Sequence, residues 1–451
     1  MPLSPARRAA FEILRRVEVE SAYASSLLAT MDERLRDDDR GLCHELVLGV
    51  LRRQSWLDRT LEHFANRRLG RIDLPVRLAL RLGLYQLRFL SRIPPSAAVN
   101  ESVNLVRAAG LKSAATFANA VLRRATREPD YDPAANVSDP VEKLALETSH
   151  PTWLIERWVK AIGFTEAAAL ARANNEPAPT AFRLTAKTSA NENEAQRIVS
   201  ELTAAGMEPR RSKIAPNSWR VIGHRPALLR SLTSAGLIYL QDEASQLVGH
   251  LLAAKPGDRV LDVCAAPGSK TTHIAALAPG AMIVAGEFYE HRSRILRELA
   301  ATQGNDSIQV VVADATVDLP FANASFDRVL VDAPCSGTGT LRRNPEIRWR
   351  IQPSDIAELS AKQERILAQA AEMVRVGGIL LYSTCSFERD ENEDVVAEFV
   401  KGHAGFDQLR LPNPRILDAP ADLATASGAI RTWPHRHDVD GFFIIGFQRR
   451  M

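Results

Sequence analysis

The stretch Arg259–Lys270, RVLDVCAAPGSK, determines how the second half of the chain folds. Its first part is a short apolar run of the kind that forms a buried strand. The turn that follows consists largely of small residues, which let the backbone bend tightly and approach a ligand: Ala265, Ala266, Gly268 and Ser269. A helix is predicted directly after the turn, and its first residues offer unpaired N–H groups. The stretch is neither a P-loop nor a G-x-G-x-x-G motif, so the ligand must be inferred from the neighbouring strands.

Strands and helices continue to alternate from Asp242 to the end of the chain. Further strands are predicted at MIVAGE, IQVVVAD, DRVLVDAPC, ILLYSTC and GFFIIGFQRR. The longest helix is predicted over DIAELSAKQERILAQAAEMVRV, with Gly377 and Gly378 as its C-terminal cap. This order predicts a doubly wound, mostly parallel Rossmann-like sheet, in which ligands bind beyond the carboxyl ends of the strands.

Three further regions precede this α/β domain. Apolar residues at helical spacing, as in AAFEILRRV and LALRLGLYQLRFL, predict an all-α bundle over residues 1–128. Residues 129–140 concentrate Pro, Asp and Asn and are predicted to form a linker. Short strands such as AFRLTA and SWRVIG flank the helical NENEAQRIVSELTAAG, which predicts a small α+β domain over residues 141–235. The α/β domain then occupies residues 236–451.

The composition is that of an ordinary globular protein, with 451 residues, 45% of them hydrophobic and 25% charged. No segment approaches the roughly 18 uninterrupted apolar residues that span a bilayer, and the N-terminus lacks a secretory apolar core. We therefore expect a cytoplasmic protein without membrane contacts, and a monomer. The four cysteines include no CxxC pair, which argues against a disulfide framework and a structural zinc site, so we expect no metal.

Charge is distributed unevenly along the chain. The net charge is only +3, yet residues 1–128 carry 22 Lys plus Arg, 21 of them Arg, against 14 Asp plus Glu. The planar guanidinium of arginine suits phosphate contacts. The N-terminal part is therefore either a nucleic-acid surface or a set of solvated helix faces, and charge alone does not decide between them.

Acidic residues end the two strands that follow the small-residue turn. Glu287 ends MIVAGE, about 20 residues past the turn, where a carboxylate accepts hydrogen bonds from both ribose hydroxyls of a nucleoside cofactor. Asp314 ends the next strand, where it could contact an adenine edge or cap the following segment. The turn and the two acids together predict a nucleoside cofactor.

Two thiols are predicted at the next two strand ends. DRVLVDAPC delivers Asp332 and Cys335, ILLYSTC delivers Cys385, and a serine follows each cysteine. A thiolate that adds to carbon 6 of a pyrimidine makes carbon 5 nucleophilic enough to take the methyl group of S-adenosylmethionine. Asp332 could hydrogen-bond ring nitrogen 3 or the exocyclic amine and so select cytosine. A second group near the first thiol could assist its release.

These motifs resemble those of a known family. CAAPGSK, DAPCSGTG, STCS, QDEAS (Gln241–Ser245) and DGFF (Asp440–Phe443) are similar to the RsmB/Fmu (Sun) branch of RNA cytosine-5 methyltransferases, and the helical N-terminus resembles its NusB-type RNA-binding domain. The resemblance implies a methyltransferase domain over residues 236–451 and a cytosine of 16S (small-subunit) ribosomal RNA as substrate. It implies Cys385 as the nucleophile and Cys335 as the cysteine needed for release. The implied contacts to S-adenosylmethionine are Cys264, Ala265, Ala266, Pro267, Gly268, Ser269, Lys270, Glu287, Asp314 and Asp332.

The chain departs from the family pattern at two cofactor positions. Ser269 stands where the family usually has Gly, and Glu287 where it usually has Asp. Both changes keep the chemistry, because serine is small and glutamate is still a carboxylate.

Two other functions stay open at this point. A DNA cytosine-5 methyltransferase would take its nucleophile from Cys335, which would leave Cys385 without a role. A non-catalytic RNA-binding factor would keep the NusB-like domain beside a degenerate methyltransferase. We further expect Cys43 and His273 to be structural, the run ERDENED (388–394) to be a solvated helix start, and RNA to contact a loop that carries Arg342, Arg343, Arg348 and Trp349.

Overall fold

The computed structural model describes residues 3–31, 35–189, 191–223, 225–305, 307–411 and 420–450. The chain forms two compact units, which are described separately. The helical unit contains Met1–Glu176 and Leu341–Arg350, and the sheet unit contains Pro177–Thr340 and Ile351–Met451. The domain limits predicted at residues 128, 140 and 235 stay predictions. Among the described residues, no helix is both long enough and apolar enough to cross a membrane.

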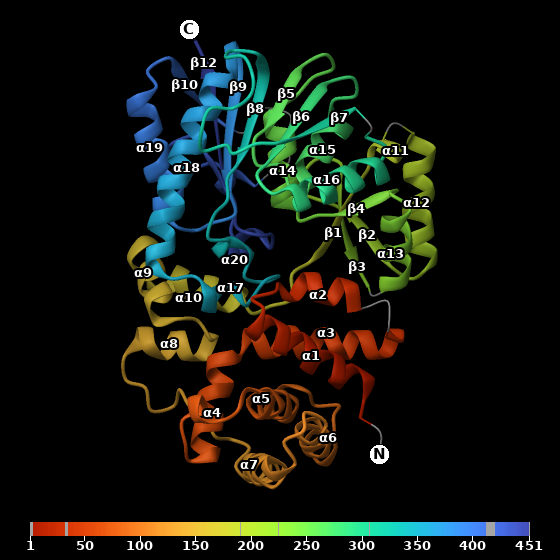
Figure 1. The fold of residues 1–451 in the computed structure, drawn as a ribbon, viewed down its shortest axis with the longest axis vertical. Helices are drawn as coiled ribbons and strands as arrows, with labels where there is room; N and C mark the ends of the chain where they lie inside the picture. Colours follow the sequence, from red (N-terminus) through yellow and green to blue (C-terminus); the bar gives the residue numbers. More distant parts are fainter. Residues whose placement is uncertain are drawn as a thin grey trace. The chain divides into compact units, whose positions relative to one another are not determined.

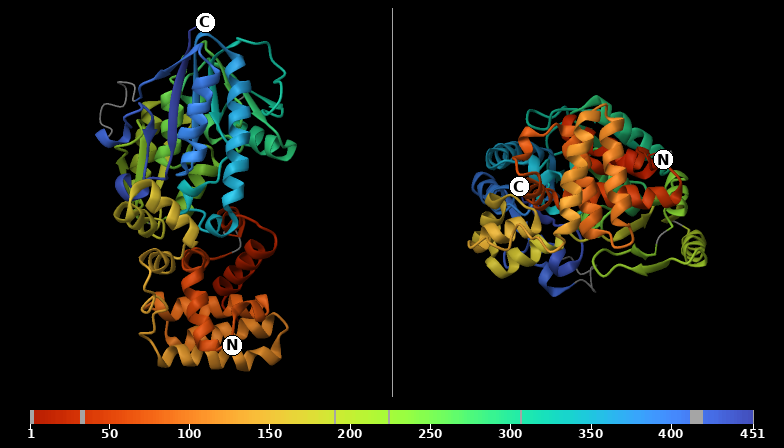
Figure 2. Two further views of the ribbon diagram at one scale, coloured as in Figure 1. Left: turned by 90° about the vertical axis from the view of Figure 1, so that its left-hand side faces the viewer. Right: turned by 90° about the horizontal axis from the view of Figure 1, so that it is seen from below.

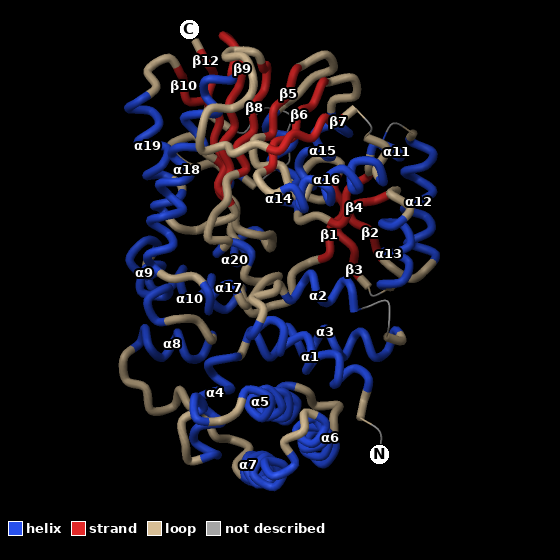
Figure 3. Tube along the Cα trace, viewed as in Figure 1, coloured by secondary structure: helices blue, strands red, loops and turns tan. Residues whose placement is uncertain are grey.

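The helical unit confirms the all-α prediction for the N-terminal part: its described residues form helices and loops (Figure 3). The helices are α1 (Pro5–Val19), α2 (Ala24–Met31), α3 (Asp37–Arg52), α4 (Gln54–Ala65), α5 (Leu74–Phe89), α6 (Pro95–Ala108), α7 (Ala115–Arg127), α8 (Pro140–Thr148), α9 (Thr152–Ile162), α10 (Phe164–Ala173) and α17 (Ile347–Arg350).

Helix α5 is the centre of this unit. Its apolar residues are buried on all sides rather than along one stripe, as expected of a helix surrounded by others. Helices α5, α6 and α7 lie side by side and are orange in the right-hand view of Figure 2. Helix α3 approaches α5 closely at Gly49, where a Cβ atom would collide with the ring of Tyr85.

Some of the arginine excess in this unit is structural. Arg81 on α5 is buried, and its guanidinium donates to both carboxylate oxygens of Asp58 at 2.6 and 2.7 Å and to Glu18 at 2.5 Å. These contacts join α1, α4 and α5. A bidentate, buried pair of this kind is strong because no water competes for the donors.

The segment Leu341–Arg350 contributes arginines to the interior of the helical unit. Arg348 is fully buried, and it donates to the Ser149 carbonyl at 3.1 Å and to Asn175 Oδ1 at 2.9 Å. Arg350 donates to the Ala22 carbonyl at 2.7 Å. The expected RNA contact through Arg348 is therefore wrong, because its donors already bind this unit's own polar groups.

The sheet unit begins with a small antiparallel sheet in the order β2-β3-β1-β4, covered by helices α11, α12 and α13. This confirms the predicted α+β domain. Its elements are β1 (Thr180–Leu184), α11 (Ala186–Ser189), α12 (Glu192–Ala204), β2 (Glu208–Arg211), β3 (Ser218–Ile222), α13 (Pro226–Ser234) and β4 (Ile238–Leu240).

The large sheet has the strand order β10-β12-β9-β8-β5-β6-β7, with β11 paired to β12 (Figure 1). Strands β5 to β9 are parallel, and β12 is antiparallel to β9 and β10. The elements are α14 (Glu243–Leu252), β5 (Arg259–Asp262), α15 (Ser269–Leu277), β6 (Met282–Glu287), α16 (Glu290–Thr302), β7 (Ile308–Val312), β8 (Phe326–Asp332), α18 (Pro353–Met373), β9 (Val374–Thr384), α19 (Glu393–Gly402), β10 (Phe406–Leu409), β11 (Ile430–Arg431), α20 (Pro434–His437) and β12 (Phe443–Arg449).

Helices cover both faces of the large sheet, which confirms the doubly wound prediction. Leu261, Val329 and Leu380 point to one face and pack with α18 and α19. Their chain neighbours point to the other face and pack with α14 and α15, because side chains alternate along a strand. All parallel strands therefore end at one edge, where the candidate site lies.

Helix α18 ends earlier than predicted. It stops at Met373, and the residues Val374–Thr384 form β9, so that Gly377 and Gly378 lie inside a strand instead of capping a helix. Val374 pairs with Phe326 of β8, and the β-branched residues of VRV suit that pairing.

Candidate active site at the carboxyl ends of the strands

A cavity of about 620 Å³ lies beyond the carboxyl ends of β5, β6, β7, β8 and β9. The structure brings most of the predicted site residues to it. Its lining includes Cys264, Ala266, Glu287, Asp314, Asp332, Cys335 and Cys385. The remaining predicted residues belong to the turn beside it, described below.

The two thiols meet in this cavity. Strands β8 and β9 are neighbours in parallel register, with Asp332 opposite Ser383. The cysteines that follow have their Sγ atoms 3.3 Å apart, and both are partly buried. The hydrogen bond to Cys385, and then burial, raise the pKa of Cys335 well above its ordinary value. Cys335 therefore stays a thiol near neutral pH and can donate to Cys385.

Asp332 forms a buried ion pair beside the thiols. Its Oδ2 lies 2.6 Å from Nζ of Lys270, and its Oδ1 accepts a hydrogen bond from the Ser383 hydroxyl at 2.9 Å. The ammonium group of Lys270 also lies over the ring of Phe442. Burial lowers the pKa of Lys270, but the Asp332 carboxylate outweighs it, and the net pKa is raised. Lys270 is thus a permanent cation next to the thiols, on the first turn of α15.

The turn from Cys264 to Lys270 is held against its surroundings by backbone contacts. Gly268 has φ +108°, and a Cβ there would lie 3.1 Å from Leu296, so this position requires glycine. The Ala266 carbonyl accepts a hydrogen bond from Arg292 at 2.9 Å. Burial raises the pKa of Cys264 well above its ordinary value, as expected for a thiol that is not reactive.

The two strand-end acids differ in exposure. Glu287 is buried, and its Oε1 accepts from the Tyr289 backbone N–H at 2.9 Å. Asp314 is partly exposed, and its Oδ1 accepts from the backbone N–H of Thr316 at 2.9 Å and from its hydroxyl at 2.7 Å. These bonds lower the pKa of Asp314 and keep it ionised. Phe288, exposed at the cavity mouth, offers an aromatic face.

The motif DGFF has a structural reason for its glycine. The Gly441 N–H donates to the Gly339 carbonyl at 2.8 Å, and the Gly339 N–H donates to the Cys385 carbonyl at 2.9 Å. A Cβ on Gly441 would collide with the ring of Phe387. The Asp440 N–H donates to Asp242 at 3.1 Å, so DGFF also contacts QDEAS. Hydrogen bonds thus connect QDEAS to DGFF, DGFF to DAPCSGTG and DAPCSGTG to STCS, although these motifs are far apart in the sequence.

Three site residues were not identified from the sequence. Asp262, at the end of β5, is fully buried and accepts from the Thr271 hydroxyl at 2.7 Å. Arg292 of α16 contacts the turn. The sequence alone gave no reason to assign it to the site, because it is one of several charged residues at the ordinary spacing of an amphipathic helix. Glu391 lies in the run ERDENED, which is not solvated throughout as expected: Glu388, Glu391 and Asn392 are buried.

Other expectations are met away from the thiols. Cys43 is buried in the core of the helical unit, and His273 is buried on α15, where burial lowers its pKa well below the ordinary value. Among the described residues, no cluster of three or more potential metal ligands occurs, and the expectation of a protein without a metal stays a prediction.

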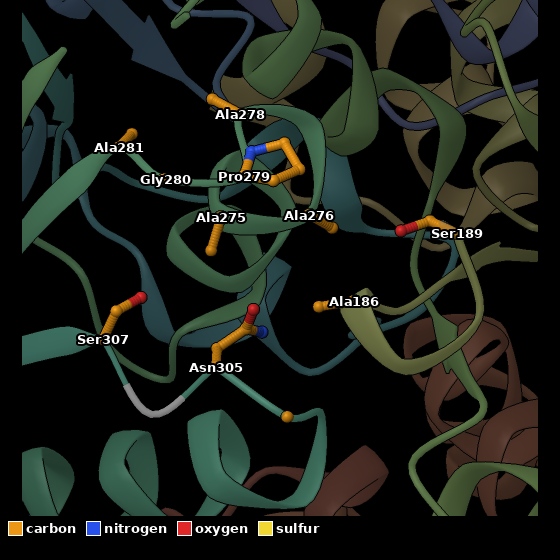
Figure 4. A pocket seen from close by; sticks show the side chains of 11 residues that line it. Ala186, Ser189, Ala275, Ala276, Ala278, Pro279, Gly280, Ala281, Asn305 and Ser307 are labelled. Carbon is orange, nitrogen blue, oxygen red and sulfur yellow. The ribbon is translucent and has the colours of Figure 1, made fainter. Parts of the chain in front are cut away.

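A second cavity in the sheet unit, of about 230 Å³, is shown in Figure 4. The residues that line it are small, and Ser189, Asn305 and Ser307 are its polar side chains. The described lining holds no ionisable side chain, so this cavity lacks the acids and thiols that distinguish the first one.

Comparisons with known proteins find three families that match parts of this chain. The family described as 16S rRNA methyltransferase RsmB/F matches residues 249–448, the NusB family matches 4–127, and the ferredoxin-like domain of RsmF/B-like methyltransferases matches 150–227. The probable ribosomal RNA small subunit methyltransferase B of Bacillus subtilis is 34% identical over 466 residues, covering 100% of both chains. Ribosomal RNA small subunit methyltransferase B of Pseudomonas syringae is 34% identical over 407 residues, covering 89% of this chain and 88% of its own.

Two solved structures have a similar fold. The crystal structure named PH0851 has a TM-score of 0.84 and 27% identity, covering 100% of this chain and 99% of its own. A methyltransferase homolog protein from Pyrococcus horikoshii has a TM-score of 0.59 at 27% identity and covers 69% of this chain and 100% of its own. The resemblance found in the motifs is thereby confirmed, and the chain belongs to the RsmB/F family of 16S rRNA methyltransferases.

Proposed function

We propose that this protein methylates carbon 5 of a cytosine in 16S ribosomal RNA, with Cys385 as the nucleophile and S-adenosylmethionine as the methyl donor. The observation that carries the proposal is the 3.3 Å separation of the Cys335 and Cys385 sulfur atoms in one cavity with Asp332. Thiols so close together, at the ends of adjacent strands, can both reach one pyrimidine ring. A structural role would not require either sulfur to line a cavity.

The residues around the cavity fit the proposed methyl donor. Glu287 is a carboxylate at the end of the second parallel strand, where a ribose diol can donate to it. Gly268 and Gly286 let the turn and β6 pack closely on their neighbours beside the cavity, since a Cβ would lie 3.1 Å from Leu296 at the first position and 3.3 Å from the Val263 carbonyl oxygen at the second. Bound there, S-adenosylmethionine would supply an electrophilic methyl group. The turn Cys264–Lys270, Glu287, Asp314 and Asp332 would hold it.

Cys385 carries out the first step. The Cys385 sulfur forms a bond to carbon 6 of cytosine, and the electron pair of the 5,6 double bond moves toward carbon 5, which then takes the methyl group. The ammonium group of Lys270, paired with the Asp332 carboxylate at 2.6 Å, places a positive charge on the same side of the site.

Asp332 acts before this step, in the binding of cytosine, and Cys335 acts after it, in the release of the product. Asp332, paired with Lys270, accepts a hydrogen bond from the exocyclic amine of cytosine, a donor that uracil lacks. A water molecule takes the carbon 5 proton, the electron pair of that C–H bond forms the 5,6 double bond again, and the sulfur–carbon bond breaks with its electron pair on the Cys385 sulfur. The Cys335 thiol donates a hydrogen bond to the departing Cys385 thiolate and so assists release.

Single-cysteine variants test this assignment. Cys385→Ala should form no covalent complex with 16S ribosomal RNA and no 5-methylcytosine, whereas Cys335→Ala should accumulate RNA-bound protein that resists denaturant. The covalent complex is followed on denaturing gels. The product is followed by bisulfite sequencing of 16S ribosomal RNA from a strain that lacks the native protein and expresses each variant. The reverse pattern would assign the nucleophile to Cys335, as in a DNA cytosine-5 methyltransferase. Failure to bind S-adenosylmethionine in calorimetry would favour a non-catalytic RNA-binding factor.

A further inference from the structure

Glu391 contacts both loops that carry the thiols. It lies in the short 3-10 helix Arg389–Glu391 and is fully buried. Its carboxylate accepts hydrogen bonds from the Ser336 backbone N–H at 2.8 Å, from the Ser336 hydroxyl at 2.5 Å and from the Ser386 hydroxyl. Gln363 of α18 donates to it at 3.0 Å. The serine after each cysteine is therefore bound to one and the same carboxylate.

The next residue extends this arrangement to the other side of Cys385. Asn392 is fully buried, its Oδ1 accepts from the Thr384 hydroxyl at 2.5 Å, and its Nδ2 donates to the Ser386 carbonyl at 2.9 Å. Both chain neighbours of Cys385 are thus fixed by residues Glu391 and Asn392. The two serine hydroxyls also lie 3.0 Å apart, within hydrogen-bond distance.

Such an arrangement resists displacement of either loop. An ionised carboxylate accepts only, and a buried one is stable only while donors surround it. If the loop of Cys335 moved away from that of Cys385, Glu391 would lose donors that no water replaces. The hydrogen bonds of Glu391 to Ser336 and Ser386 therefore hold the two loops at a fixed separation.

We propose that Glu391 is a positioning residue that sets the distance between the two thiols, and thereby the balance between attack by Cys385 and release assisted by Cys335. The balance rests on the proposed function, because it has meaning only for that reaction. The distance between the thiols can be measured without any substrate.

The first test is the rate at which the two thiols pair in Glu391→Gln. The oxidant diamide takes two electrons and two protons from the thiols onto its azo bond, and a disulfide joins Cys335 and Cys385. Glutamine has the size of glutamate, but its N–H₂ group is a donor and cannot accept the hydrogen bonds that the second carboxylate oxygen accepts. We expect pairing to slow by about 10- to 100-fold, the factor equivalent to losing one hydrogen bond to a charged group. Glu391→Asp, which keeps the carboxylate, should recover part of the rate.

Glu243→Gln is the matched control. Glu243 is also a buried carboxylate of the sheet unit, with Ser212 and Arg220 as its partners, and it bonds to neither cysteine loop. It should lower the thermal midpoint without changing the rate of thiol pairing. The positioning role would be overturned if Glu391→Gln formed the disulfide at the wild-type rate. It would also be overturned if Glu243→Gln slowed disulfide formation as much as Glu391→Gln does.

The second test separates the two loops during the reaction with 16S ribosomal RNA. Ser386→Ala should slow formation of the covalent complex, and Ser336→Ala should slow its decay, each by about tenfold. Single-turnover kinetics with rapid quenching measure both steps. Equal effects of the two variants on both steps would contradict the proposed balance. If the wild type pairs its thiols rapidly but forms no complex with RNA, the proposed function fails, and the distance set by Glu391 stands.

Discussion

The two halves of the cavity are held by different kinds of contact. Glu287 and Asp314 lie on the half that we propose holds the cofactor, called the cofactor half below, and each accepts a hydrogen bond from the backbone N–H two residues further along the chain. On the thiol half, Ser336 is bound by a residue 55 positions away. The acids therefore depend on their own loops, while the thiols depend on segments distant in sequence. We infer that the cofactor half tolerates conservative exchanges, as the Glu for Asp at position 287 suggests, and that the thiol half does not.

Gly339→Ala gives the largest expected effect, because it breaks the thiol half. A Cβ there would collide with the Gly441 carbonyl oxygen and would lie 2.8 Å from that of Cys385. We expect RNA methylation to fall by about 100-fold or more, since a displacement of about 1 Å costs that much in a positioned site. Affinity for S-adenosylmethionine, measured by calorimetry, should stay within about threefold.

Gly402→Ala is the control for this substitution. No atom lies within 4 Å of a Cβ at that position, which ends α19. Its methylation rate should match the wild type. Full activity in Gly339→Ala would show that the thiol half adapts after all, and the comparison would fail.

Asp262→Asn probes the border between the halves, because β5 lies between β6 and β8. Burial raises the pKa of Asp262 from 3.8 to about 7. The folded chain then holds this proton more tightly than the unfolded chain, so the stability that it contributes is complete below pH 3.8 and is lost as the pH rises to about 7. The wild type should lose roughly 3 kcal/mol of this contribution between pH 5 and pH 8, and the variant should not.

Urea unfolding of both proteins at the two pH values measures this difference. The relevant quantity is the change in the free energy of unfolding of the wild type minus that of Asp262→Asn. If the free energy of unfolding changed equally with pH in both proteins, the Asp262 carboxylate would be as well stabilised in the folded chain as in water. That result would contradict the effect expected from its burial.

Glu287→Ala sharpens the comparison on the cofactor half, with a smaller effect. Loss of one charged acceptor should weaken S-adenosylmethionine binding by about 10- to 30-fold, while methylation at saturating cofactor changes little. Glu287→Asp should bind within about threefold of the wild type. Calorimetry gives both affinities, and Glu290→Ala, which removes an exposed acid on α16, serves as the control. A large loss in Glu287→Asp would refute the tolerance inferred for this half.

Much of the fold could be predicted because its signals are local. The buried strands β5, β6, β8 and β9 are apolar runs, and the acids and cysteines that follow them fall at one edge of any parallel sheet. The strands that were missed, β2, β10 and β11, are short, lie toward the edges of their sheets and include polar residues, so no apolar pattern marks them.

The remaining site residues could not be predicted because their roles depend on distant partners. Nothing near Glu391 in the sequence distinguishes it from the exposed Arg389 or the half-buried Asp390. Its burial follows only once α18 and the two cysteine loops are brought together. The RNA contact predicted for Arg348 was wrong for the same reason. An arginine in a polar loop is usually solvated, but the acceptors that bury Arg348 lie 173 to 200 positions away in the sequence.

The segment Leu341–Arg350 has a consequence for how this gene can change. It is encoded within the sheet unit, between Thr340 and Ile351, yet it completes the interior of the helical unit. A truncation that begins after Glu176 would leave Arg348 without its carbonyl acceptors, in the same loop that starts at Cys335. Loss of residues 1–176 would therefore also require substitutions in the segment Leu341–Arg350. The two units are expected to be inherited together.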